Sequence, residues 1–82
     1  MWMHENLDSQ ELLVLLKNRA ITLAGNSNLK IYGMLACKSG RRMYKANRVF
    51  FTNETEAVDQ GYRPCGHCMK TAYELWNSSI DQ

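Results

Sequence analysis

The stretch "YRPCGHCMK", residues 62–70, is the part of the sequence that says most about the fold, because it holds Cys65 and Cys68 with two residues between them. The only other cysteine is Cys37. Two thiolates at this spacing can reach a single metal ion, so Cys-x-x-Cys is half of a typical zinc site. Cys37, just past a predicted strand, is the candidate third ligand. A closed tetrahedral site needs a fourth.

The fourth ligand is not obvious from the sequence. His67 is adjacent to Cys68 and therefore poorly placed to bind the same ion, and His4 is far away along the chain. Water could also complete the shell. In the alternative interpretation, the cysteines are buried as small apolar residues, and His67 either faces solvent or donates a hydrogen bond to a thiolate.

"CGHC" also looks like the active-site motif of protein disulfide isomerases, in which a helix terminus activates the first thiol. The thioredoxin fold of that family places the motif early and continues with further strands and helices. Here 14 residues follow Cys68. That fold cannot be completed, so redox chemistry is the weaker alternative.

Length and composition predict one small domain, residues 1–82, with its core at about residues 20–76. An apolar core of this size supplies only about 3–5 kcal/mol of stability, so a bound metal would help to hold the fold. The first ten residues lack Lys and Arg, and no apolar run is long enough for a membrane span. An odd number of cysteines fits a reducing compartment. These features predict a soluble, cytoplasmic protein with no membrane segment.

The net charge of +2 conceals an uneven distribution. The span from Leu12 to Asn53 has no acidic residue but contains eight basic ones. These are Lys17, Arg19, Lys30, Lys38, Arg41, Arg42, Lys45 and Arg48. Such a span favours a polyanionic partner, DNA or RNA. The alternative is a solvated surface whose counter-charges come from the acidic ends of the chain.

Helix-capping patterns predict two of the helices. Asp8, with Glu11 three residues later, predicts a helix over about residues 9–18. The same pattern at Asn53 predicts a short helix over residues 54–60 that stops at Gly61. The CGHC pair is expected to open a last helix. Its buried stripe, at i, i+3, i+4 and i+7, comprises Met69, Ala72, Tyr73 and Trp76.

Alternating apolar residues predict the sheet. Residues 20–33 alternate on either side of a polar "GNSN" turn at 25–28, which is typical of a hairpin. The apolar run "RVFF", residues 48–51, predicts a third strand beside it. We therefore expect an α+β fold with a three-stranded antiparallel sheet flanked by helices.

Three segments together resemble the metal-binding module of the Ada DNA methylation-repair proteins. They are "KIYGMLAC" (30–37), "NRVFF" (47–51) and "TEAVDQGYRPCGHC" (55–68). The resemblance covers about residues 20–70, and its Gly-Tyr-Arg-Pro-Cys-x-x-Cys ending is the specific part. It implies that family's fold and a zinc site.

In that family four cysteines bind zinc, and the first is also the nucleophile that takes a methyl group from a DNA backbone phosphotriester. The resemblance places the second, third and fourth ligands at Cys37, Cys65 and Cys68. The first falls on Gly33, which has neither a donor atom nor a thiol. The resemblance therefore implies a zinc site of altered composition, without the methyl acceptor.

The leading functional hypothesis is an Ada-like, zinc-binding module that binds DNA backbone, related to DNA repair and its transcriptional regulation, and is not an enzyme. The residues expected to contact DNA are Arg41, Arg42, Lys45, Arg48 and Arg63. One alternative is a metal-free scaffold that serves as a protein-interaction or regulatory module. A second is residual methyl acceptance at Cys37.

Overall fold

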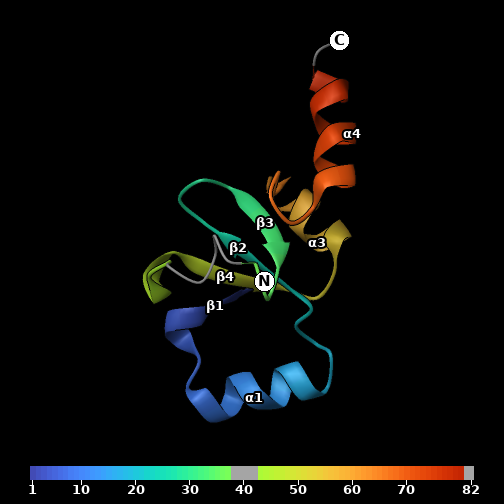
Figure 1. Ribbon diagram of the computed structural model, residues 1–82. Coiled ribbons are helices and arrows are strands. Elements are labelled where there is room, and N and C mark those ends of the chain that lie inside the picture. The colour runs from blue at the N-terminus through green and yellow to red at the C-terminus, as the bar shows by residue number, and fades with distance from the viewer. Residues whose placement is uncertain (38–42, 81–82) are drawn as a thin grey trace.

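The computed structural model describes residues 1–37 and 43–80, with side chains as far as Ser78. Within these residues a five-stranded sheet has the order β1-β4-β2-β3-β5 (Figure 1). The strands are β1 (Trp2–Met3), β2 (Leu23–Asn26), β3 (Ile31–Met34), β4 (Arg48–Phe51) and β5 (Arg63–Pro64). The helices are α1 (Ser9–Lys17), α3 (Glu54–Asp59) and α4 (Lys70–Ile80), with 3-10 turns η1 (His4–Asn6) and η2 (Lys45–Asn47).

The predicted three-stranded antiparallel sheet is the centre of this sheet, but the prediction missed both edges. β4, β2 and β3 are antiparallel, as expected. β1 adds to β4 in antiparallel orientation, whereas β5 adds to β3 in parallel, so the sheet is mixed. Each edge strand has two residues, too few to show the alternation on which strand prediction depends.

The β5 edge is fixed by main-chain hydrogen bonds on either side of Pro64. The Arg63 amide donates to the Lys30 carbonyl at 2.9 Å, and the Cys65 amide donates to the Tyr32 carbonyl at 2.8 Å. Pro64 has no amide hydrogen and occupies the intervening position, whose amide would point away from β3. The pairing therefore carries the chain directly into the first cysteine of the pair.

The β2–β3 hairpin turns two residues later than predicted, over Ser27–Lys30. Gly25 lies in β2 and not in the turn. A Cβ at this position would lie 2.9 Å from the Phe51 ring, so the strand requires glycine here. The side-chain oxygen of Asn26 accepts from the amides of Asn28 and Leu29 at 2.9 and 3.1 Å. Asn26 thus ends the strand and also accepts the hydrogen bonds of the turn. This explains why the polar stretch "GNSN" begins inside β2.

One face of the sheet forms the core. The buried residues Tyr32, Val49 and Phe51 pack with Ala57 of α3 and with Tyr62. The Phe51 and Tyr62 rings meet edge to face with centroids 4.9 Å apart. The short helix α3 thus seals the core.

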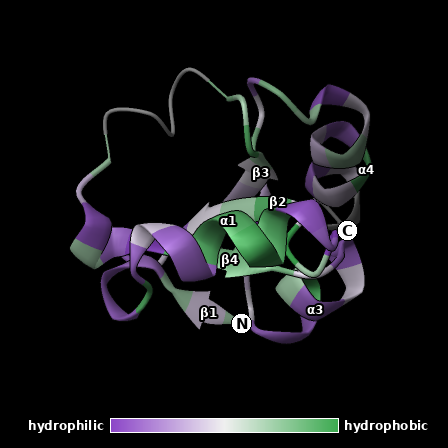
Figure 2. Cartoon of the chain, turned by 90° about the horizontal axis from the view of Figure 1, so that it is seen from below, coloured by the Kyte–Doolittle hydropathy of each residue, from purple (hydrophilic) through white to green (hydrophobic). Residues whose placement is uncertain are grey.

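The first helix begins as predicted, with both hydrogen bonds of the Asp8–Glu11 capping box present. Its apolar face, with Leu12 among it, is only half-buried, and Leu13 and Val14 are each 51% exposed. Figure 2 shows this apolar middle between polar ends. Capping and local pattern therefore form α1, while the core lies elsewhere.

The last helix begins later than predicted, at Lys70. Cys65 to Cys68 form a turn instead, which the Met69 amide closes by donating to the Cys65 carbonyl at 3.0 Å. Ala72, Tyr73 and Trp76 are half-buried, as the stripe predicts. Figure 1 shows α4 extending away from the sheet on the opposite side from α1.

Candidate metal centre

Three cysteines converge at the β3–β5 edge. The thiol sulfurs of Cys37, Cys65 and Cys68 all lie within 4.8 Å of one another, and the Cys37–Cys65 pair is 4.0 Å apart. Cys37 is buried, and the other two are partly exposed. The sequence prediction that strand β3 and the last part of the chain bring these residues together is confirmed. The cluster is able to hold a metal ion.

Main-chain amides point at two of the sulfurs. The Met34 amide donates to the sulfur of Cys68 at 3.3 Å, and the His67 amide donates to that of Cys65 at 3.4 Å. Such N–H···S bonds stabilise the thiolates that a metal requires. The turn and the strand end are therefore shaped for negatively charged sulfur.

The surroundings of Cys68 favour the protonated form of its thiol. Burial, together with the neighbouring thiols of Cys37 and Cys65, raises the pKa of Cys68 to about 11 against the lowering effect of the Met34 amide. A coordinated cation deprotonates a thiol outright. Binding of a metal would therefore release protons from the cluster.

Gly33 faces the cluster. A Cβ at this position would lie 2.7 Å from the sulfur of Cys68 and 3.2 Å from the Cβ of Cys65. A side chain at residue 33 would thus point toward Cys65 and Cys68 of the cluster. Here that place is taken by the Cys68 sulfur, and residue 33 supplies no donor.

Neither histidine supplies the fourth ligand among the described residues. His4 packs edge to face on Phe50 of β4, with ring centroids 5.1 Å apart, which puts it on the opposite side of the sheet from β5. His67 is exposed, and its amide, not its ring, contacts the cluster. The metal-capable group found within the described residues consists of the three cysteines.

An apolar pocket of about 240 Å³ adjoins the cluster. Cys37 and Cys65 line it together with Gly33, and Met34 and Met43 are also among its lining residues. The cluster therefore borders this apolar pocket through Cys37 and Cys65.

The basic residues Arg48 and Arg63 lie in one row across the sheet. Arg48 is paired with Asn26 of β2. Asn26 is paired with Ile31 of β3, and Ile31 with Arg63 of β5. Three steps between neighbouring strands place the two arginine backbones about 14 Å apart. Strand register thus places in one row two arginines that are far apart in the sequence.

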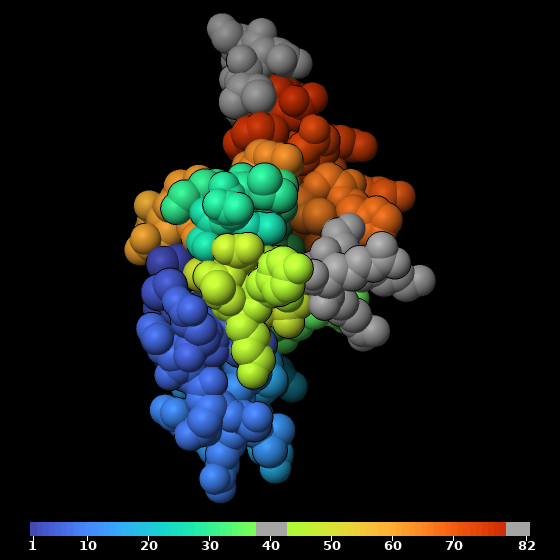
Figure 3. Space-filling model, turned by 90° about the vertical axis from the view of Figure 1, so that its left-hand side faces the viewer, coloured from blue at the N-terminus to red at the C-terminus, as the bar shows by residue number. Residues whose placement is uncertain are grey.

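Two lysines extend this row into a basic end of the sheet, comprising Lys30, Lys45, Arg48 and Arg63. Lys45 lies in η2, just before β4, and Lys30 ends the β2–β3 turn. The two segments touch, because Ser27 donates its amide to the Asn47 carbonyl at 2.8 Å. Figure 3 shows the turn (teal) directly against η2 (yellow-green) on the face toward the viewer.

The predicted contact residues Arg41 and Arg42 lie outside the described residues. Lys45, Arg48 and Arg63 lie at the basic end. Lys30 was not among the predicted contacts, although it immediately precedes Ile31, whose pairing with Arg63 brings the backbones of the two basic residues together. The strand register that unites them could not be read from a two-residue strand.

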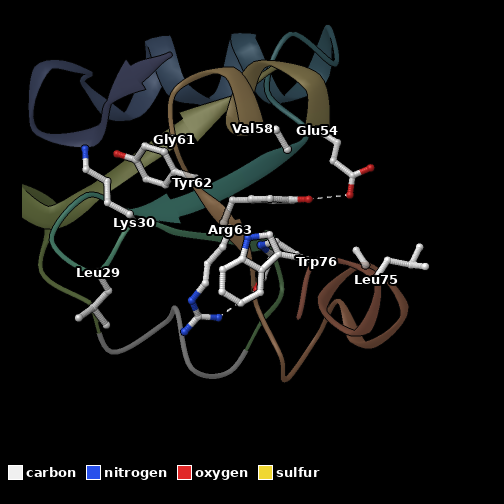
Figure 4. Close-up of a pocket in the computed structure, with 12 residues that line it drawn as sticks. Leu29, Lys30, Glu54, Val58, Gly61, Tyr62, Arg63, Leu75 and Trp76 are labelled. Atoms are coloured by element: carbon white, nitrogen blue, oxygen red, sulfur yellow. Dashed lines mark hydrogen bonds between the residues drawn. The ribbon is translucent and has the colours of Figure 1, made fainter. Parts of the chain in front are cut away.

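Arg63 lies in an open groove of about 540 Å³ (Figure 4). Its guanidinium carbon lies 5.3 Å from the Trp76 ring centroid and 5.5 Å from that of Tyr73. It also donates to the Pro64 carbonyl at 3.2 Å. Tyr73 and Trp76, expected in the core, therefore also hold this arginine in place through cation–π contacts.

The sequence family described as the metal-binding domain of Ada matches residues 18–70, which include the whole cysteine cluster. The chain belongs to the Ada metal-binding family. No curated protein and no solved structure matches it significantly. Among the described residues no helix has the length and apolar character of a membrane span.

The cysteines of this Ada domain fit zinc. Four sulfurs around a tetrahedral zinc at about 2.3 Å lie about 3.8 Å from one another, so the Cys37–Cys65 separation of 4.0 Å requires only a slight contraction. The family and the cluster together indicate zinc, with the fourth ligand unassigned. When bound, zinc supplies a structural link between β3 and the turn before α4.

Proposed function

We propose that this Ada-type domain binds the DNA backbone without sequence preference, through its basic end and with zinc as a structural brace. The observation that carries the proposal is the register that aligns Arg48 with Arg63 across four strands. Lysine and arginine side chains bind phosphate wherever it lies, irrespective of base sequence. Arg41 and Arg42 lie outside the described residues, and their contact with DNA stays a prediction.

The cysteine cluster lies close to this surface, since Cys65 follows Arg63 by two residues. Zinc with four thiolates would carry a charge of −2, whereas three thiolates and a neutral fourth ligand leave −1. Gly33 therefore removes one negative charge from beside the DNA-binding surface. In the Ada repair proteins that this chain resembles, methylation of the first cysteine removes the same charge. Constitutive affinity for DNA follows from this difference.

The proposed role is non-catalytic, in a cytoplasmic protein related to DNA repair and its regulation. Residue 33 offers no thiol, and Cys37 is 8% exposed. A buried thiol is poorly placed to attack a phosphotriester on a DNA surface. Incubation with methylated DNA is therefore expected to leave the mass of every cysteine-containing peptide unchanged, and a gain of one methyl at Cys37 would refute this.

The test is a fluorescence-anisotropy titration of the reduced, zinc-loaded protein with a duplex of random sequence. We expect a Kd between about 1 and 100 µM at low salt, with a steep loss of affinity as salt rises. Absence of binding at about 100 µM protein would contradict the proposal.

Lys45→Gln and Lys17→Gln form a matched pair for this titration. Both lysines are exposed, but Lys17 lies on α1, away from the β2–β3 turn (Figure 1). We expect Lys45→Gln to weaken binding and to reduce the salt slope by about 1, and Lys17→Gln to change neither. Equal effects of the two variants would show that the basic charges act from all faces, as in a protein-interaction scaffold.

A further inference from the structure

The metal centre provides three sulfur donors and a position at which the fourth is missing. All three sulfurs lie within 4.8 Å of one another, which is close enough for a single ion. The direction of a Cβ at Gly33, 2.7 Å from the Cys68 sulfur, shows where a fourth side chain would enter. The Cys68 sulfur occupies that place. The donor set is therefore complete at three, as far as the described residues provide it.

Metal ions differ in what three thiolates offer them. Zinc in structural sites is almost always four-coordinate and needs a further ligand. Monovalent copper is a soft ion that thiolate and thioether donors select, and three thiolates satisfy it. Loss of the fourth protein ligand therefore penalises zinc much more than monovalent copper.

The surroundings of the cluster favour the same soft ion. The adjoining pocket of about 240 Å³ is lined by Met34 and Met43 as well as by Cys37 and Cys65. Thioethers and thiolates are ligands of one class, and neither histidine nor carboxylate enters the cluster within the described residues. A soft ion would reach the thiols through this pocket, and each thiol would lose one proton to solvent on binding.

We infer that the Cys37, Cys65 and Cys68 cluster is a three-thiolate site for monovalent copper in addition to zinc, and that Gly33 is the residue that sets this selectivity. The inference rests on the metal centre of the proposed function but not on DNA binding. Its test therefore uses no DNA, and failure of either proposal leaves the other standing.

The first experiment is X-ray absorption of the reduced protein loaded with one equivalent of monovalent copper. We expect a single shell of three sulfurs. Cys68→Ala is expected to reduce this shell to two, while Met43→Leu, a control for the thioethers, keeps three. A two-sulfur shell in the unaltered protein, or no change in Cys68→Ala, would overturn the inference.

The second experiment compares Gly33→Cys with Gly33→Ala, which adds the same Cβ beside the Cys68 sulfur but no thiol. Competition with chelators of known affinity gives the zinc and copper constants of each. We expect Gly33→Cys to bind zinc at least about tenfold more tightly than Gly33→Ala, with copper affinity changed less than about threefold. Equal zinc affinities, or equal gains for both metals, would show that Gly33 does not set selectivity. If neither variant folds, the number of sulfurs around copper in the unaltered protein and in Cys68→Ala still tests the three-thiolate site.

Discussion

The two edges of the sheet are alike in size and differ in what holds them. β1 and β5 each have two residues. At the β1 edge, His4 packs against Phe50, and the N-terminal amine lies 3.1 Å from a carboxylate oxygen of Glu56. At the β5 edge, the chain leads into a cluster of thiols beside a glycine. One edge is closed by ordinary packing, and the other is arranged for a ligand that the polypeptide does not supply.

The two edges therefore differ in how they contribute to the stability of this small domain. The buried core lies on the face of β4, β2 and β3 that α3 covers. The β5 edge adds two flanking main-chain hydrogen bonds, and α4 is attached largely through it. We therefore expect metal binding to control the order of β5 and α4, and to leave the β1 edge unaffected.

Removal of the metal is expected to give the largest effect. At free zinc of about 100 times the Kd, binding contributes about 2.7 kcal/mol, which corresponds to a fall in Tm on chelation of about 10–20 °C for a domain of this size. Hydrogen exchange should accelerate at the amides of Met34 and Cys65 and remain unchanged at Met3. Uniform acceleration across both edges would show that the edges are not independent.

Gly61→Ala is expected to have an intermediate effect on the β5 edge. Gly61 has a φ of +85°, and nothing lies within 4 Å of an added Cβ, so the cost is conformational only. The left-handed region costs a non-glycine residue about 1–2 kcal/mol, and each kcal/mol lowers Tm by about 4–8 °C. Thermal unfolding by circular dichroism measures it.

Gly66→Ala is the matched control for this substitution. Gly66 is not in the left-handed region, and its added Cβ would meet the Tyr73 ring at an ordinary 3.4 Å. A Tm equal to that of the unaltered protein is expected. A larger loss in Gly66→Ala than in Gly61→Ala would mean that the turn, rather than φ, limits stability here.

The smallest expected effect is an acid sensitivity of the β1 edge. Burial, with the positive charges of Arg48 and then Lys45, lowers the pKa of His4 from its ordinary 6.5. The unfolded chain therefore binds a proton at a pH where the native chain does not. The contribution of His4 to stability is complete above about pH 6.5 and is lost as the pH falls from there toward the lowered native pKa.

His4→Gln tests this contribution. The variant should lose a few degrees less of Tm than the unaltered protein between pH 7 and pH 5, because it has no proton to gain at this site. Acid release of a metal would affect both proteins, so the difference between the two curves isolates His4. Parallel curves would show that this histidine is not linked to folding.

Local chemistry predicted much of the fold. The capping residues Asp8 and Asn53 gave the starts of α1 and α3. Alternation gave the central hairpin, and an apolar run gave β4. The hairpin turn was misplaced because Gly25 is required by contact with Phe51, a partner distant in sequence, rather than by the turn. Spacing alone does not distinguish these two reasons for a glycine.

The candidate site divides in the same way. Cysteine spacing was sufficient to predict the cluster, because Cys-x-x-Cys is a local signal and Cys37 had to pack nearby. The basic end was predicted only in part, because Lys30 and Arg63 meet through the pairing of β3 with β5. That pairing is non-local and only two residues long. Its residues carry no periodic signal that could have revealed it.

Pro64 has a consequence for how copies of this protein behave in concentrated solution. The unpaired side of an edge strand can template a strand from another molecule, which is a common route to aggregation. Arg63 and Cys65 both direct their amides inward to β3, so the outward amide of this edge would be that of residue 64. Proline has none to offer. The edge beside the thiol cluster therefore offers a foreign strand no outward amide at residue 64, and this weakens it as a template for pairing.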